Sequence, residues 1–234
     1  MQSLNGKAGV QATSDALMKL SKRAEGLLDR MLQSNAFLKA FHEGTQTHRE
    51  LYRRHILETA IRIRMNNAVD SFALANTIQD DPLAKYLLTY LREEYGHDRM
   101  FEEDLRVMGL SDSDLEEAEP FFSTELLMSF LWNSVQKDGM LPALVWNWLV
   151  EWYSARYNQR ITNAAAAVVG DDSVRQANRH IELDDEMEHE DALTHALTSL
   201  IERDGALPRA EHYVDRFVRL IDMYFQELLG EFGL

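Results

Sequence analysis

The chain has 234 residues, 45% of them hydrophobic, a formal net charge of −15 and no cysteine. The acidic balance without a basic run argues against nucleic acid or an anionic membrane surface as a partner. The absence of cysteine excludes disulfides, thiolate metal sites and cysteine nucleophiles. The N-terminal MQSLNGKAGVQATSD lacks an apolar signal segment, and no apolar run is long enough to span a membrane. We therefore expect a cytoplasmic protein.

Helix breakers are scarce, with only 11 Gly and 4 Pro, and apolar residues recur at steps of three and four along most of the chain. This pattern predicts an all-α bundle of seven or more helices with essentially no strand. We expect residues 1–12 to be a flexible lead and residues 13–234 to form a single helical-bundle domain. Bundles with this much apolar surface often dimerise, so we also expect a homodimer.

The predicted helices are separated by short segments that contain Gly, Pro, Asp or Ser. In chain order they cover residues 14–33, 36–42, 45–78, 83–108, 112–119, 121–137, 142–169, 174–203 and 208–232.

The predicted helix 45–78 has a carboxylate on its apolar face. Glu58 lies seven residues from Leu51 and seven from Met65, so its side chain should point inward. Two interpretations have equal weight. Glu58 is either a metal ligand or one half of an i,i+4 ion pair with Arg62.

The predicted helix 83–108 carries two polar interruptions of its apolar stripe, Glu94 and His97. A carboxylate and an imidazole aimed at a core are costly unless something pairs with them. A metal ion is the simplest general partner. One Glu-x-x-His motif is weak evidence by itself, so the interpretation depends on whether other helices supply ligands.

Two further helices show the same kind of interruption. In the helix 142–169, Glu151 breaks the stripe that contains Trp148 and Ala155. In the helix 174–203, the core side marked by Leu193 and Leu197 extends backward to His189, Glu186, Asp185 and Glu182. On a straight helix, His180 and Asp184 fall on the opposite face.

Together these positions form a recognisable ligand set: Glu58, Glu94-x-x-His97, Glu151 and Glu186-x-x-His189, with Asp185 as a further candidate. Two single carboxylates and two Glu-x-x-His motifs on four helices are the ligands of carboxylate-bridged di-iron or di-manganese centres. Carboxylates bridge two cations, and imidazoles complete the coordination while leaving positions open for dioxygen.

The segments REEYGHDRMFEEDLRVMGL and NRHIELDDEMEHEDAL resemble ligand helices of the haem-oxygenase-like di-metal oxidases, over about residues 45–200. This family includes a fatty acid decarboxylase that forms 1-undecene, and it shares its fold with thiaminase II. The resemblance implies a haem-oxygenase-like bundle, two Fe(II) or Mn ions and O2 as co-substrate. Glu94, His97 and Glu151 match the family's ligands.

The later ligand helix departs from the family pattern, which is His-x3-Asp-x2-His in several members. His180-x3-Asp184 fits its first half, but Met187 stands at the third position. Two shifted alternatives are Glu182-x3-Glu186-x2-His189 and Asp185-x3-His189, and a π-bulge in this helix could also bring His180 and His189 to one side. His189 is common to the shifted alternatives and is the expected ligand, while the choice among Asp184, Asp185 and Glu186 stays open.

The resemblance implies an iron-dependent oxidoreductase that activates O2 to desaturate, decarboxylate or cleave a small carboxylate or amino-acid-like substrate. Arg62 and Arg64 are candidate binders of the substrate carboxylate. The alternatives are thiaminase-like hydrolysis, which needs the cysteine this chain lacks, haem binding through His42 or His48, and a non-enzymatic storage or helical binding protein.

Overall fold

The computed structural model describes residues 15–186 and 189–234, and it describes their side chains except within residues 185–192. These residues form helices and no strand, which confirms the predicted all-α class. The helices are α1 (Asp15–Ser34), α2 (Ala36–His42), α3 (Arg49–Thr77), α4 (Asp81–Glu94), α5 (His97–Val107), α6 (Asp112–Glu116), α7 (Phe122–Asp138), α8 (Leu141–Val169), the 3-10 helix η1 (Asp171–Val174), α9 (Arg175–Glu186), α10 (His189–Asp204) and α11 (Leu207–Glu231).

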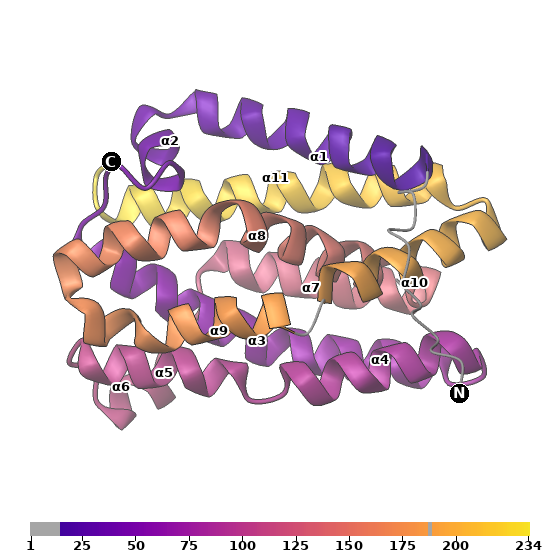
Figure 1. Ribbon diagram of the computed structural model, residues 1–234, viewed down its shortest axis with the longest axis horizontal. Coiled ribbons are helices and arrows are strands. Elements are labelled where there is room, and N and C mark those ends of the chain that lie inside the picture. The colour runs from indigo at the N-terminus through magenta and orange to yellow at the C-terminus, as the bar shows by residue number, and fades with distance from the viewer. Residues whose placement is uncertain (1–14, 187–188) are drawn as a thin grey trace, which may run out of the picture.

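The long helices run along one common direction (Figure 1). α4 and α5 lie end to end along one edge of the bundle, while α1 and α11 pack together along the opposite edge. α3 packs against α4, α5, α7 and α8, and α8 packs against α7, α9, α10 and α11, so these two helices connect the others. Their inward faces are where side chains from several helices meet.

Local sequence explains several helix starts. Asn35 precedes α2, and its side chain accepts hydrogen bonds from the N–H groups of Phe37 and Leu38 at 2.8 and 3.0 Å. Ser111 and Asp114 form a capping box that starts α6. Each cap satisfies backbone donors that a helix cannot pair within itself.

The prediction of one helix over 83–108 was wrong. α4 ends at Glu94 and α5 begins at His97, because Gly96 takes a left-handed conformation with φ of 101°. That conformation costs glycine little and terminates a right-handed helix. The apolar stripe looked continuous because the two helices follow one another along the same edge (Figure 1).

The predicted helix over 174–203 corresponds to α9 and α10, and residues 187 and 188 between them lie outside the described residues, so its continuity stays a prediction. The segment contains α9, which packs against α5 and α8, and α10, which packs mainly against α8. A face deduced from the apolar residues of α10 therefore does not continue along α9. Of the described helices, none combines the length and the apolar character needed to cross a lipid bilayer.

Candidate metal centre

Glu94 and His97 meet at the joint between α4 and α5. Glu94 is the last residue of α4 and His97 the first of α5. The Nδ1 of His97 lies 3.2 Å from the Oε2 of Glu94. Their exposed fractions are only 7% and 6%. The left-handed Gly96 lets the chain turn between them, so both side chains enter the same buried space.

His180 of α9 completes a cluster with these two residues. Glu94, His97 and His180 each offer a ligand atom, and the three atoms lie within 4.8 Å of one another. The ring centroids of His97 and His180 are 4.5 Å apart. His180 and Asp184 were expected on the face opposite to the ligands. That expectation for a straight helix was wrong for His180, because α9 packs on α5 and this packing brings His180 beside His97.

Asp184 orients His180. Its Oδ2 lies 3.1 Å from the Nδ1 of His180. A carboxylate accepts hydrogen bonds, so Nδ1 carries the hydrogen and Nε2 of the neutral ring keeps the lone pair. Nε2 is buried and has no hydrogen-bond partner among the described residues. A carboxylate behind an imidazole is the usual support of a metal-bound histidine.

The charges around His180 suit a cation. Burial alone would lower the pKa of this imidazole, but the hydrogen bond to Asp184 and the negative charges of Asp184 and Glu94 outweigh it. The pKa of His180 therefore lies above its usual value. The same negative charges favour a metal ion at this place, and a metal ion would compete with a proton for the ring nitrogen.

Glu151 of α8 reaches the same space from another side. It is 7% exposed, and its Oε1 accepts a hydrogen bond from the hydroxyl of Tyr90 at 3.3 Å. Burial, followed by the charges of Glu94 and Glu151, raises the pKa of Tyr90 well above 10, so the hydroxyl remains a donor. Glu94, Glu151, His180 and Asp184 all line one cavity of about 140 Å³.

Asp104 of α5 positions the helix that carries His180. It is 1% exposed and accepts hydrogen bonds from the N–H groups of Gln176 and Ala177 at 3.0 and 2.8 Å. These are donors of the first turn of α9. The sequence contained a signal for this residue, because Asp104 lies seven residues after His97 on the same helix face.

A buried amide cluster lies behind the site. Asp70 is fully buried and accepts hydrogen bonds from the side-chain amides of Asn147, at 3.1 Å, and Asn66, at 2.9 Å. Burial raises the pKa of Asp70 to about 7. The hydrogen bond from Asn147 lowers this pKa, and the negative charge of Glu94 raises it further. Asn66 and Asn147 form part of the cavity wall. The sequence analysis did not single out this cluster.

Glu58 lies outside the group of Glu94, His97 and His180. Its fully buried carboxylate accepts hydrogen bonds from Arg54 at 2.6 Å, from the N–H of Phe121 at 2.8 Å and from Thr124 at 2.6 Å. The expected alternative, a pair with Arg62, is not formed, because Arg54 one turn earlier takes the carboxylate. Here Glu58 caps the start of α7.

The remaining predicted ligands, Asp185, Glu186 and His189, have side chains outside the described residues, so they stay predictions. The described donors are carboxylates and imidazoles, which suit iron and manganese. The lone pair of His180 Nε2, buried without a partner beside Glu94 and His97, fits such an ion.

A family model described as "Iron-containing redox enzyme" matches residues 59–224. The chain belongs to this family of iron-containing redox enzymes. The match begins within α3 and ends within α11. It includes the residues around the candidate centre, which are Glu94, His97, Glu151, His180 and Asp184. No curated protein is similar enough in sequence to count as a match.

Solved structures show which fold this family member has. A domain of unknown function with a heme oxygenase-like fold from Shewanella denitrificans OS217 is 18% identical, with a TM-score of 0.79 over 93% of this chain and 94% of that one. A TenA family transcription regulator from Silicibacter sp. TM1040 is 14% identical, with a TM-score of 0.72 over 93% and 97%. A CADD-like protein of unknown function from Nostoc punctiforme PCC 73102 is 15% identical, with a TM-score of 0.67 over 92% and 98%. The chain therefore has the haem-oxygenase-like fold.

The two histidines considered for haem are engaged in other contacts in this member of the family. The Nδ1 of His42 is 2.8 Å from the carbonyl of Leu38, and its Nε2 is 2.6 Å from the hydroxyl of Tyr153. His48 accepts a hydrogen bond from the N–H of Leu51 at the start of α3. These contacts give no support to either residue as an axial ligand.

Proposed function

We propose that the protein is a non-haem iron oxidase that uses O2 to oxidise a small carboxylic or amino acid. The observation that carries the proposal is the convergence of ligand atoms of Glu94, His97 and His180 within 4.8 Å, beside a cavity that Glu94 and His180 line. Membership of the iron-containing redox enzyme family supports iron as the metal.

The ligands we propose are Glu94, His97, Glu151 and His180, with Asp184 supporting the ring of His180 and with Asp185, Glu186 and His189 as candidates beyond the described side chains. When bound, a pair of ferrous ions would supply the activation of O2. Two carboxylates and two imidazoles leave coordination positions open on two ions, whereas a structural site would be closed. Manganese is the alternative metal, and metal analysis distinguishes the two.

The chain's own residues prepare the site for this chemistry. Asp184 holds the ring of His180, and Tyr90 holds an oxygen of Glu151, so both ligands are oriented before metal arrives. Apolar side chains on the cavity wall, among them Ile63, Val150 and Ile161, limit the access of water to the reacting groups. Arg62 on the same wall supplies a cation for an acidic substrate.

Oxygen consumption by the anaerobically reconstituted ferrous protein tests the proposal. Glu94→Ala should remove iron binding and oxygen consumption together. Arg62→Ala should spare iron binding and weaken only the effect of an added acid on the rate. If the parent protein binds iron and never consumes O2 with any small acid, the oxidase proposal is wrong.

A further inference from the structure

Arg62 lies on the cavity wall, and none of the described side chains is an acidic partner for it. Its Nη2 donates a hydrogen bond to the hydroxyl of Thr59 at 3.2 Å, and its guanidinium carbon is 4.9 Å from the ring centroid of Tyr224. Within the part of the chain that the structure describes, it forms no ion pair. Glu58, one turn earlier, is occupied by Arg54. A cation is therefore available to a ligand inside a strongly acidic protein.

His55, seven residues before Arg62 on α3, lines the same cavity. Its Nδ1 lies 2.7 Å from the hydroxyl of Tyr224, and the guanidinium of Arg62 lies over the ring of the same tyrosine. A guanidinium can only donate. The tyrosine proton has no other acceptor among the described residues, so it goes to Nδ1 of His55.

This network fixes which nitrogen of His55 carries hydrogen. Burial, then the charge of Arg62, lowers the pKa of His55 to about 3, so the ring is neutral at pH 7. With Nδ1 accepting from Tyr224, the ring hydrogen is on Nε2. No described residue accepts a hydrogen bond from that Nε2. The cavity wall thus offers two kinds of unused donor, the imidazole N–H of His55 and the guanidinium N–H groups of Arg62.

We propose that His55 and Arg62 form a subsite for the carboxylate of a monocarboxylic acid, whose other atoms extend toward Glu94 and His180. The two side chains come from the same side of α3 and both contact Tyr224, so both donors can serve one ligand. A planar carboxylate matches the fork of a guanidinium. Binding at this subsite needs no metal, while its use in orienting a substrate rests on the proposed oxidase function.

The rest of the cavity argues for a single negative charge and an apolar chain. Glu94, Glu151 and Asp184 line the same space, so a second negative charge on the ligand would be repelled. Ile63, Val150 and Ile161 contribute apolar surface between the polar groups. The cavity volume of about 140 Å³ is close to the roughly 150 Å³ of a cavity that holds one benzene molecule, so it suits a short-chain acid.

The test is calorimetric titration of the full-length, chelator-treated protein with hexanoate and with hexanamide, its uncharged counterpart. We expect hexanoate to bind at least about tenfold more tightly than hexanamide. Inorganic phosphate, which carries more charge, should bind more weakly than hexanoate. Equal binding of acid and amide, tighter binding of phosphate, or no binding of hexanoate would overturn the subsite.

Variants locate the subsite. Arg62→Gln should weaken hexanoate binding by about tenfold or more and leave hexanamide unchanged, and Arg62→Lys should retain part of the affinity. Tyr224→Phe should cause a smaller loss, because it removes the donor that fixes the ring hydrogen of His55. Arg64→Gln is the matched control on the same helix, since Arg64 is exposed and pairs with Asp98 and Glu102.

Two results keep this test separate from the proposed function. Arg62→Gln should bind iron as the parent does, and its circular dichroism and melting temperature confirm folding. If Arg62→Gln and Arg64→Gln have the same hexanoate affinity, the subsite is wrong even if iron and O2 chemistry are found. If iron does not bind while hexanoate responds as expected, the oxidase proposal fails and the subsite stands.

Discussion

The carboxylate of Asp104 accepts a hydrogen bond from the N–H of Ala177 at 2.8 Å, and this contact joins the helix that begins at His97 to the helix that carries His180. Replacing Asp104 by Ala leaves two backbone donors at the start of α9 without their acceptor, at a cost of about 1–3 kcal/mol. We predict that Asp104→Ala lowers iron affinity by about tenfold or more, in the range found for residues that support metal ligands. Asp104→Asn, which keeps one acceptor oxygen, should lose less.

A matched control separates positioning from general stability. Glu227 accepts hydrogen bonds from the N–H groups of Phe122 and Ser123 at 3.2 and 2.9 Å, in the same way but at the start of α7, which carries no proposed ligand. Glu227→Ala should lower the melting temperature and preserve iron affinity. The same loss of iron affinity in both variants would show that Asp104 acts only through overall stability.

Glu58→Gln should destabilise the protein without removing iron. The fully buried carboxylate of Glu58 accepts from Arg54, from Thr124 and from the N–H of Phe121, and a glutamine amide nitrogen cannot accept. The expected cost of about 1–3 kcal/mol corresponds to a fall in melting temperature of about 2–4 °C per kcal/mol for a chain of this size. Loss of iron with an unchanged melting temperature would instead make Glu58 a ligand.

Stability should depend on pH through His42. Burial lowers the pKa of this imidazole to about 4, and only the hydrogen bond to the carbonyl of Leu38 opposes the shift. The folded pKa lies below the unfolded value of about 6.5. The contribution is therefore fully present above pH 6.5 and is lost as pH falls toward about 4.

Denaturant unfolding between pH 4 and 7 measures this effect. The parent should lose up to about 1.4 kcal/mol per pH unit more than His42→Gln within that window, since one proton is taken up on unfolding. Subtracting the variant removes the contribution of the many carboxylates. Parallel pH profiles for the two proteins would contradict the assignment.

Much of the fold follows from sequence periodicity. The segment 36–42 was predicted as a helix and is α2 (Ala36–His42), and the long apolar stripes of α3, α8 and α11 lie on buried faces. Glu94, His97 and Glu151 stood out because each interrupts such a stripe, and each is buried in the structure. A side chain's direction on a regular helix depends only on local geometry, which a sequence specifies well.

The rest depended on contacts between distant segments. The predicted alternative for Glu58 was an ion pair with Arg62. Its carboxylate instead accepts hydrogen bonds from Arg54 and from two groups more than sixty residues away, the hydroxyl of Thr124 and the N–H of Phe121. His180 was placed on the wrong face because the apolar residues of α10 were extended into α9, which packs on a different neighbour. The turn at Gly96 had a visible signal, a glycine between the two candidate ligands, which the continuous stripe concealed.

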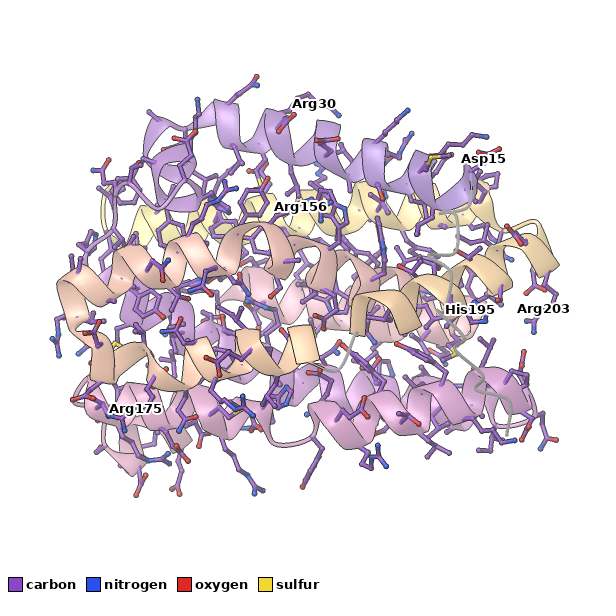
Figure 2. The ribbon with its side chains drawn as sticks, in the orientation of Figure 1. Asp15, Arg30, Arg156, Arg175, His195 and Arg203 are labelled. Carbon is purple, nitrogen blue, oxygen red and sulfur yellow. The ribbon has the colours of Figure 1, made fainter. Side chains whose placement is uncertain are left out.

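Anaerobic titration with Fe(II), followed by metal analysis and by the melting temperature, tests the central claim most directly. His180→Gln is the informative variant, and His195→Gln is the control. His195 is exposed on α10 and lies toward the opposite end of the bundle from Arg175, the first residue of α9 (Figure 2).

We predict that the parent and His195→Gln bind about two iron ions per chain. Their melting temperatures should rise with free iron, as expected for a ligand that binds only the folded state. His180→Gln should lose both effects. A parent protein that neither binds Fe(II) nor gains stability from it, or a His180→Gln variant that behaves like the parent, would contradict an iron centre at Glu94, His97 and His180.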